Sequence, residues 1–122
     1  MWALVEEAGR DRPDAVVLVD DYGRSLTSAQ FRDAAEQVAA GLVDLGIGPG
    51  DAVSWQLPTV LEAPVLMSAC ARLGAVQNPI IPILREREVR YITLEAGTEL
   101  LIVRPQWRSF DYEALATKAV AA

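Results

Sequence analysis

Apolar and polar residues alternate in blocks between Leu26 and Val103, and the order of the blocks predicts helices and strands in turn. The predicted helices are residues 27–45, 59–73 and 85–96, and the predicted strands are residues 51–57, 75–77 and 100–103. Strands that alternate with helices along a chain form right-handed βαβ units around a mainly parallel sheet. We therefore predict an α/β fold, in which a mainly parallel sheet carries flanking helices.

The segments on either side of this region carry weaker signals. Residues 2–8 predict a short helix that Gly9 and Pro13 stop, and residues 15–19 and 24–26 predict two strands joined by a turn. Residues 110–122 predict a last helix, which has no Gly or Pro stop signal. We expect from this open end that the chain is an N-terminal piece of a longer protein.

The spacing of apolar residues also predicts which side of each element is buried. The residues expected on one side are Phe31, Ala34, Ala35, Val38, Leu42 and Leu45 in the first long helix, Val53, Trp55 and Leu57 in the strand after it, and Val89, Ile92 and Ala96 in residues 85–96. A capping box of Thr27 and Gln30 should begin the first long helix, and Gly46 should end it in a left-handed conformation. Residues 100–103 are continuously apolar, as in a strand covered on both faces.

The composition excludes several classes of function. A net charge of −6 and a pI near 4.5 argue against binding to nucleic acid, which needs a basic face. One cysteine, Cys70, and no histidine exclude a disulfide framework, the usual zinc patterns, and Cys–His or Ser–His catalytic pairs. The hydrophobic share of 52% indicates faces that another layer covers, and with them self-association through exposed apolar surfaces.

The chain lacks the sequence features of export or membrane insertion. Residues 1–7 have neither the basic start nor the long apolar run of a signal peptide. The longest apolar stretch, residues 63–71, is far shorter than the roughly 20 residues that span a bilayer. We expect a cytoplasmic protein without a transmembrane segment, and the single cysteine suits a reducing compartment.

Three local motifs invite a functional interpretation, and for each we favour a structural one. The glycines of residues 46–50 close a helix and lead into a strand, the reverse of a phosphate-binding loop, and Pro49 removes an amide donor. Asp20 and Asp21 are typical of a solvated turn rather than of a metal site. Cys70 lies in an Ala-rich segment without a base, as a packing thiol does. We predict no catalytic residue and no metal site in this chain.

Two further positions leave alternatives open. The charges of residues 85–90 form either a solvated helix face or a contact with a partner or a membrane surface. Pro64 is tolerable if it lies near the first turn of its helix, and it kinks the helix if it lies deeper.

Five blocks of the sequence, in this order and spacing, resemble the opening segment of an acyl-CoA synthetase of the adenylate-forming, AMP-binding superfamily. The blocks are residues 26–31 (LTSAQF), 48–51 with 56–58 (GPGD and QLP), 71–80 (ARLGAVQNPI), 85–88 (RERE) and 107–114 (WRSFDYEA). The last two are most similar to fatty-acyl and cyclohexanecarboxylate-type CoA ligases. Together the blocks cover most of this chain and a minor part of a typical family member.

The resemblance implies the activity of a parent enzyme. Such ligases join a carboxylic acid to ATP in the presence of Mg²⁺, release pyrophosphate, and pass the acyl group from its adenylate to CoA. Their chemistry belongs to a Ser/Thr/Gly-rich loop that ends in Lys, to acidic residues for Mg²⁺ and the ribose, and to a C-terminal Lys. None of these has a counterpart in this chain.

The chain is therefore expected to be a partial N-terminal subdomain, residues 1–122, without the phosphate-loop and C-terminal domains. It would serve as a scaffold, be inactive alone, and bind none of ATP, Mg²⁺ and CoA strongly, with the remainder of the synthetase chain as its partner. The alternative is a free-standing, non-catalytic interaction module derived from such an enzyme. A nucleotide-binding regulator is a third hypothesis, which rests on the α/β pattern by fold analogy.

Arg104 and Arg108 are the candidate binding residues. In some relatives, Arg residues just after the strand that matches residues 100–103 contact the phosphates of CoA. A guanidinium on a loop can hold a phosphate with two parallel hydrogen bonds. The alternative is that both residues are ordinary surface arginines.

Overall fold

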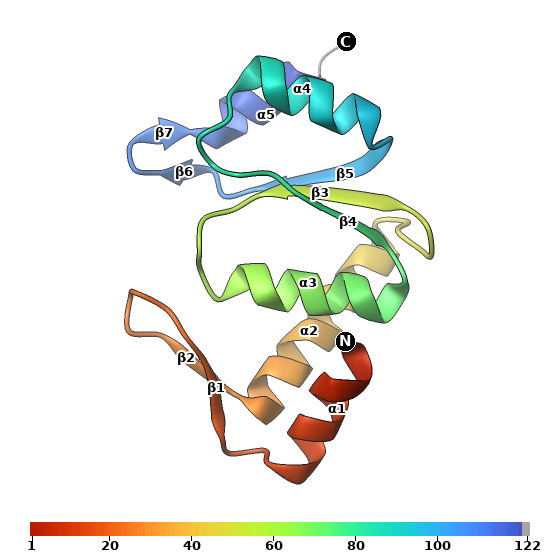
Figure 1. The fold of residues 1–122 in the computed structure, drawn as a ribbon, viewed down its shortest axis with the longest axis vertical. Coiled ribbons are helices and arrows are strands. Elements are labelled where there is room, and N and C mark those ends of the chain that lie inside the picture. Colours follow the sequence, from red (N-terminus) through yellow and green to blue (C-terminus); the bar gives the residue numbers. More distant parts are fainter. Residues whose placement is uncertain (121–122) are drawn as a thin grey trace. The chain divides into compact units, whose positions relative to one another are not determined.

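The computed structural model describes residues 1–120, which form two compact units. Unit 1 consists of Met1–Gly50 and Thr59–Ala75, and unit 2 consists of Asp51–Pro58 and the chain from Val76 onward. The helices and strands follow one another in the α/β order that the sequence predicts (Figure 1). The fold-class prediction is confirmed, since the main sheet is parallel and is accompanied by helices.

Unit 1 is built from three helices and a β-hairpin. Its elements are α1 (Trp2–Asp11), β1 (Val16–Val19), β2 (Ser25–Thr27), α2 (Ser28–Asp44) and α3 (Glu62–Leu73). The two strands pair antiparallel around the predicted turn. The α2 helix contacts both α1 and α3, and it buries Ala35, Ala39 and Leu42.

Both ends of α2 follow local sequence signals. The Thr27 hydroxyl accepts a hydrogen bond from the Gln30 N–H at 3.2 Å, and the Gln30 side chain accepts one from the Thr27 N–H at 2.9 Å, which confirms the predicted capping box. Gly46 follows the last turn with a φ of +88°, as predicted. The prediction that Leu45 points inward is wrong. This residue caps the helix and is 68% exposed, and Ile47 is buried instead.

Two helices of unit 1 differ from their predicted bounds. The prediction that Gly9 stops α1 is wrong, because the helix continues to Asp11, but it does end before Pro13, the second predicted stop. Gly9 is buried where α1 meets α2, and a Cβ there would lie 3.0 Å from the Arg32 side chain. The α3 helix begins only at Glu62, so Pro64 lies in its first turn. An N–H in that turn has no helical partner, so the proline costs no hydrogen bond.

Unit 2 holds the main sheet and two helices. Its elements are β3 (Ala52–Gln56), β4 (Val76–Pro79), α4 (Glu86–Glu95), β5 (Thr98–Val103), β6 (Gln106–Trp107), β7 (Phe110–Asp111) and α5 (Tyr112–Val120). The sheet has the strand order β4-β3-β5 with all strands parallel, and β6 and β7 form a separate antiparallel pair. Helices α4 and α5 contact each other and β5 (Figure 1). The core of unit 2 consists of Ile80, Val89, Leu115 and Ala119, with Leu84, Ile92, Leu101 and Phe110 packed against them.

The position of a strand in the sheet decides its burial. All residues of the central strand β3 are buried, including Ser54 and Gln56 on the side opposite the predicted apolar one. The alternation of side chains thus predicts the strand but not the burial of both its faces. Residues 100–103 of β5 are only half-buried, so the prediction that both faces of this strand are covered is wrong. The reason is that β5 lies at the edge of the three-stranded sheet.

A polar bridge crosses the sheet at Ser54. This side chain is fully buried, and its Oγ accepts a hydrogen bond from Asn78 Nδ2 at 2.8 Å. The same Oγ lies 2.6 Å from Thr98 Oγ1, and either hydroxyl can donate. A buried hydroxyl needs such partners, so the bridge favours this one register of the three strands.

Two elements of unit 2 end differently from their predictions. The β4 strand continues past Gln77 to Pro79, which an edge strand tolerates because one side of its backbone needs no sheet partner. The α4 helix ends at Glu95, so Ala96 is exposed rather than inward, and Thr93 is buried instead.

The α5 helix begins at Tyr112, later than predicted. Residues 110–111 pair with β6 as a short strand, a hairpin that the sequence pattern did not predict. The predicted end of this helix at residues 121–122 lies outside the described residues.

Candidate binding edge of the parallel sheet

The three parallel strands end at the same edge of the sheet, at Gln56, Pro79 and Val103. Open parallel sheets bind ligands just outside such carboxyl ends. The loop of residues 80–85 follows β4 at this edge, and the β6–β7 hairpin follows β5 (Figure 1). This edge is therefore the candidate binding site of unit 2.

Gln56 holds the loop that follows β4. Its side chain is 1% exposed, and its Nε2 lies 3.1 Å from the Ile81 carbonyl oxygen, 3.4 Å from that of Pro82 and 2.9 Å from that of Leu84. An amide NH₂ has two protons, so the three carbonyls share them. The Oε1 of the same amide is buried and has no hydrogen-bond partner among the described residues. The loop backbone is thus held against the end of β3.

Arg85 and Tyr112 hold the same loop from its other end. An Arg85 Nη1 donates to the Pro82 carbonyl at 2.8 Å and to the Leu84 carbonyl at 3.2 Å. The Tyr112 hydroxyl also donates to the Pro82 carbonyl, at 3.0 Å. The Arg85 guanidinium lies 3.8 Å from the centre of the Phe110 ring, in a cation–π contact. Side chains from β3 and α5, together with Arg85 of the loop itself, therefore hold the loop backbone.

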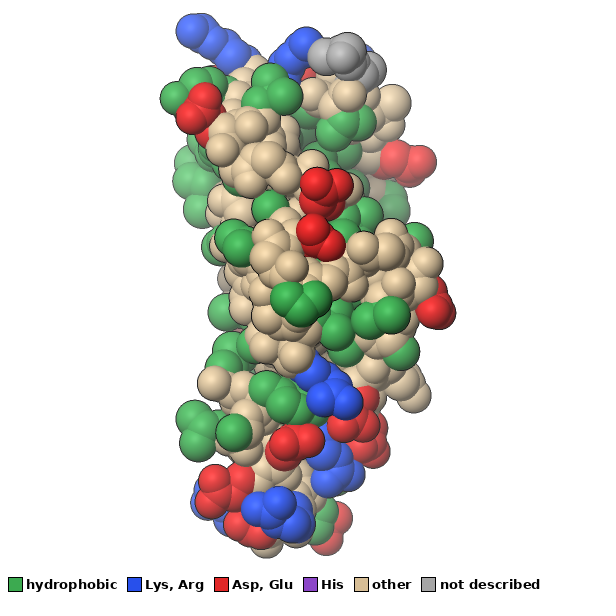
Figure 2. Space-filling view, turned by 90° about the vertical axis from the view of Figure 1, so that its right-hand side faces the viewer, with side chains coloured by type: hydrophobic (Ala, Val, Ile, Leu, Met, Phe, Trp, Pro, Cys, Tyr) green, Lys and Arg blue, Asp and Glu red, His purple; other side chains and the backbone are tan. Residues whose placement is uncertain are grey.

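The loop exposes two large apolar side chains, Ile81 at 57% and Ile83 at 75%. Its backbone is fixed by the contacts above, so it cannot fold these side chains inward. Exposed apolar residues of this kind are also found elsewhere, with Leu4 and Val19 of unit 1 at 70% each. On the face that Figure 2 shows, hydrophobic side chains reach the surface at many separate places.

The structure places Arg104 and Arg108 around the hairpin that follows β5. Arg104 is exposed in the short link between β5 and β6. Arg108 lies in the turn between β6 and β7, and its guanidinium is 4.5 Å from the centre of the Trp107 ring. Arg108 and Ser109 both have a positive φ, 49° and 61°, a backbone conformation that favours glycine. Both arginines thus lie outside the strands, beyond the carboxyl end of β5, and this agrees with the predicted loop.

The remaining residues offer little further chemistry. Within residues 1–120, no three His, Cys, Asp or Glu side chains are grouped so that they could hold a metal ion. Gly46 and Gly50 have positive φ in the turn between α2 and β3, and this turn opens no helix whose N–H groups could hold a triphosphate. Burial raises the pKa of the Cys70 thiol, which makes it less nucleophilic.

Asp20 belongs to an ion-pair network rather than to a metal site. Its carboxylate accepts hydrogen bonds from the Tyr22 N–H, the Arg24 N–H and Arg24 Nε, at 3.0, 3.0 and 2.7 Å. Burial works in the opposite direction, but these hydrogen bonds lower the pKa of Asp20 below its ordinary value. Arg24 also donates to both oxygens of Glu62, at 2.7 and 2.9 Å. The network joins the β1–β2 hairpin to the start of α3.

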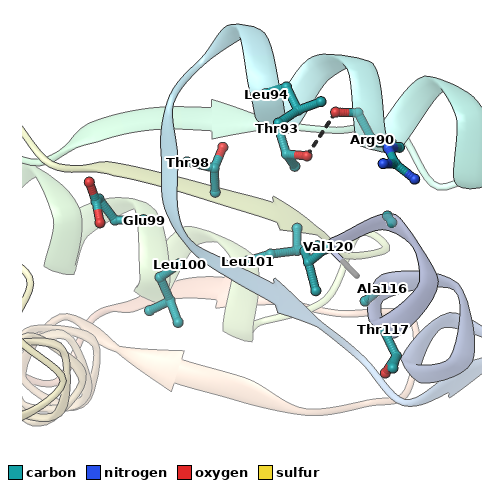
Figure 3. Close-up of a pocket in the computed structure, with 11 residues that line it drawn as sticks. Arg90, Thr93, Leu94, Thr98, Glu99, Leu100, Leu101, Ala116, Thr117 and Val120 are labelled. Carbon is teal, nitrogen blue, oxygen red and sulfur yellow. Dashed lines mark hydrogen bonds between the residues drawn. The ribbon is translucent and has the colours of Figure 1, made fainter. Parts of the chain in front are cut away.

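Unit 2 also contains an open cleft between α4, β5 and α5, with a volume of about 510 Å³ (Figure 3). Its walls carry Leu94 from α4, Leu100 and Leu101 from β5, and Val120 from α5. Because the residues that β5 contributes are Thr98 to Leu101, the cleft lies toward the amino end of that strand. It is therefore distinct from the carboxyl edge described above.

Sequence reasoning missed Gln56, Arg85 and Tyr112. Gln56 had one usable signal, since it is a polar residue at the end of a buried strand. Arg85 was assigned to a solvated helix face, and Tyr112 to the predicted last helix. Their meeting at one loop depends on the packing of α5 and has no signal in the local sequence.

The sequence profile of the family described as AMP-binding enzyme matches residues 5–122. The chain belongs to this family. The resemblance to adenylate-forming ligases is thereby confirmed. The expected fold is confirmed too, since the chain superimposes on part of the N-terminal subdomain of Klebsiella oxytoca NpsA with a TM-score of 0.79 and 25% identity, covering 91% of the chain and 28% of that subdomain.

Curated relatives of this chain are ligases of more than one kind. It is 37% identical over 116 residues to the 2-hydroxy-7-methoxy-5-methyl-1-naphthoate–CoA ligase of Streptomyces carzinostaticus, covering 95% of the chain and 21% of that protein. It is 32% identical over 117 residues to the vibriobactin-specific 2,3-dihydroxybenzoate-AMP ligase of Vibrio cholerae, covering 96% of the chain and 21% of the relative. The chain thus spans about a fifth of the length of these relatives.

A solved structure of the same family supports the fold. The chain superimposes on a fatty acyl CoA synthetase of Mycobacterium tuberculosis with a TM-score of 0.80 and 29% sequence identity, covering 84% of the chain and 20% of that protein. No helix between residues 1 and 120 combines the length and apolar character that a membrane crossing requires.

Proposed function

We propose that the chain is a partial N-terminal subdomain of an ATP-dependent ligase that converts a carboxylic acid and CoA to an acyl-CoA, with release of AMP and pyrophosphate. The observation that carries this proposal is the family match over residues 5–122, together with the 37% identity to a CoA ligase. A relative that is an AMP ligase shows that the family match alone does not select CoA as the acceptor. The proposal includes a small-molecule acid substrate, of which a fatty acid is one candidate, and a cytoplasmic location.

The role of this segment in the parent enzyme is that of a scaffold. Its carboxyl-edge loop is held by neutral hydrogen bonds and one guanidinium, and the chain has no histidine and a single lysine, Lys118. The phosphate loop that the family resemblance implies has no counterpart in this chain, so we assign the triphosphate and Mg²⁺ to the remainder of the synthetase chain. By the same argument the segment is inactive alone and binds ATP, Mg²⁺ and CoA at most weakly.

The test compares the full-length product of the gene with the 122-residue chain. We expect ATP-dependent formation of an acyl hydroxamate, in the presence of hydroxylamine, from the full-length protein and none from the 122-residue chain. Hydroxamate formation by the short chain would contradict the scaffold role. A full-length protein that activates none of a panel of aliphatic, alicyclic and aryl acids would contradict the ligase assignment.

Arg104 and Arg108 are the residues we propose to contact the phosphates of CoA. Both are exposed beside the hairpin at the carboxyl edge, and a guanidinium suits a phosphate by charge and by its paired donors. In the full-length enzyme, Arg104→Ala or Arg108→Ala should raise the KM for CoA by about tenfold to 150-fold, since a hydrogen bond between charged groups contributes about 1.5–3 kcal/mol. The rate of pyrophosphate release, which reports the adenylate step, should stay unchanged.

Arg87→Ala is the matched control for these variants, because Arg87 is another exposed arginine of unit 2 and lies on α4. It should change neither half-reaction. An equal rise in the KM for CoA in all three variants would show a general effect of surface charge and would remove the CoA role of Arg104 and Arg108.

The exposed apolar side chains also favour a second candidate, a free-standing interaction module derived from such an enzyme. Ile83 and Val19 are at least 70% exposed, as residues at a partner surface often are. A gene that encodes only this chain, a monodisperse and cooperatively unfolding product, and a saturable partner would support this candidate. Aggregation of the isolated chain through its apolar faces would count against it.

A further inference from the structure

The threonines on the walls of the cleft between α4, β5 and α5 are occupied by hydrogen bonds within unit 2. The Thr93 hydroxyl donates to the Val89 carbonyl at 2.9 Å, and the Thr117 hydroxyl donates to the Glu113 carbonyl at 2.9 Å. The Thr98 hydroxyl is 2.6 Å from Ser54 Oγ. The three hydroxyl groups therefore already have partners inside unit 2, and an occupant of the cleft gains little from them.

Two large apolar side chains stand open at this cleft. Leu94 is 68% exposed and Val120 is 61% exposed, and Figure 3 shows them with Leu101 around the same hollow. Arg90 and Glu99 add one positive and one negative side chain to the lining. An apolar centre with charged groups beside it is typical of a surface that another polypeptide covers.

The position of the cleft argues against a small-molecule substrate. Ligands of open parallel sheets bind at the carboxyl ends of the strands, whereas this cleft contacts β5 from Thr98 to Leu101, in the amino-terminal part of the strand. A second copy of the chain is also disfavoured, because two chains of net charge −6 repel each other.

We infer that this cleft receives an amphipathic segment from the remainder of the synthetase chain, an inference that rests on the proposed function. The chain spans about a fifth of its relatives, so most of such a protein is available to cover the cleft. The segment places apolar side chains over Leu94, Leu101 and Val120. An acidic side chain pairs with Arg90, and a basic one pairs with Glu99.

The test measures cysteine labelling in the full-length protein. Leu94→Cys reports on the cleft, and Tyr91→Cys is the matched control, because Tyr91 lies on the same helix, is 65% exposed and does not line the cleft. The native Cys70 is buried and gives a low background in this segment. Each variant is treated with a maleimide under native conditions, and peptide mass spectrometry locates the label.

We expect Leu94→Cys to react at least about tenfold more slowly than Tyr91→Cys, at every protein concentration and also after unfolding and refolding in clean buffer. Equal labelling at both sites, fast or slow, would overturn the inference. Protection that grows with protein concentration would indicate a second copy, and protection lost on refolding would indicate a bound small molecule. Either result would also overturn it.

The hydroxamate assay on the same full-length samples separates this inference from the proposed function. An active ligase with an open cleft would refute the inference alone. An inactive protein with a protected cleft would refute the proposed function alone.

Discussion

Arg108 and Ser109 form the turn of the β6–β7 hairpin with φ values of 49° and 61°. A residue with a Cβ in this region costs about 1–2 kcal/mol, and two-residue hairpin turns therefore prefer Asn and Gly. Ser109→Gly should remove part of this strain and leave the Arg108 guanidinium in place. We expect the free energy of unfolding to rise by about 0.5–1 kcal/mol, because the greater entropy of glycine in the unfolded state offsets the rest.

Urea unfolding of the two proteins measures this change. Ser25→Gly is the matched control, since Ser25 is an exposed serine of β2 without a positive φ. Glycine at an ordinary strand position should lower the stability by about 0.5–1 kcal/mol. A loss of stability in both variants would show that the turn carries no relievable strain at Ser109.

The contact between the β1–β2 hairpin and α3 rests on the ion pairs of Arg24 with Asp20 and Glu62. The pKa of Asp20 is lowered from 3.8 in the folded chain, so below pH 3.8 the unfolded chain binds more protons than the folded chain. Above pH 3.8, the Asp20 carboxylate makes its full contribution to the free energy of unfolding. This contribution falls as the pH drops below that value and is lost below the folded pKa.

Asp20→Asn tests this element-scale contact. The variant should be less stable than the parent chain at pH 7, and the difference should shrink below pH 3.8 as the Asp20 carboxylate is protonated and becomes neutral like the Asn amide. Thermal unfolding over this pH range measures the difference. Asp21→Asn, in the same turn, is the matched control for the loss of one acidic side chain. A pH-independent difference for Asp20→Asn would mean that the carboxylate acts by shape rather than by charge.

At the scale of the whole molecule, the two units alternate along the chain. The central strand β3 belongs to unit 2, the α3 helix that follows it belongs to unit 1, and the next strand, β4, returns to unit 2. Neither unit is one continuous segment, so neither can be removed by cutting the chain at one place. The sheet of unit 2 has two edge strands, β4 and β5, which a larger protein can extend or cover.

Local sequence determined the elements whose signals lie within one turn or one strand. Thr27 and Gln30 cap α2 through contacts between residues three apart, and Gly74 ends α3 with a φ of +70° because it lacks a Cβ. The apolar run at residues 100–103 likewise marks β5. The order of these elements was enough to predict an α/β fold with a parallel sheet. The five sequence blocks that resemble acyl-CoA synthetases were enough to predict the family.

Tertiary structure alone decided what depends on residues far apart in the chain. Both faces of β3 are buried, and the strand lies between β4 and β5. The alternation of apolar and polar residues along a strand does not show where that strand lies in the sheet. Gln56 and Tyr112 reach the loop of residues 80–85 only because the sheet and α5 bring them together. Periodicity and capping are local and can be read from neighbouring residues. Strand order and the packing of α4 and α5 are non-local, and they set the edge, the cleft and the surfaces on which function depends.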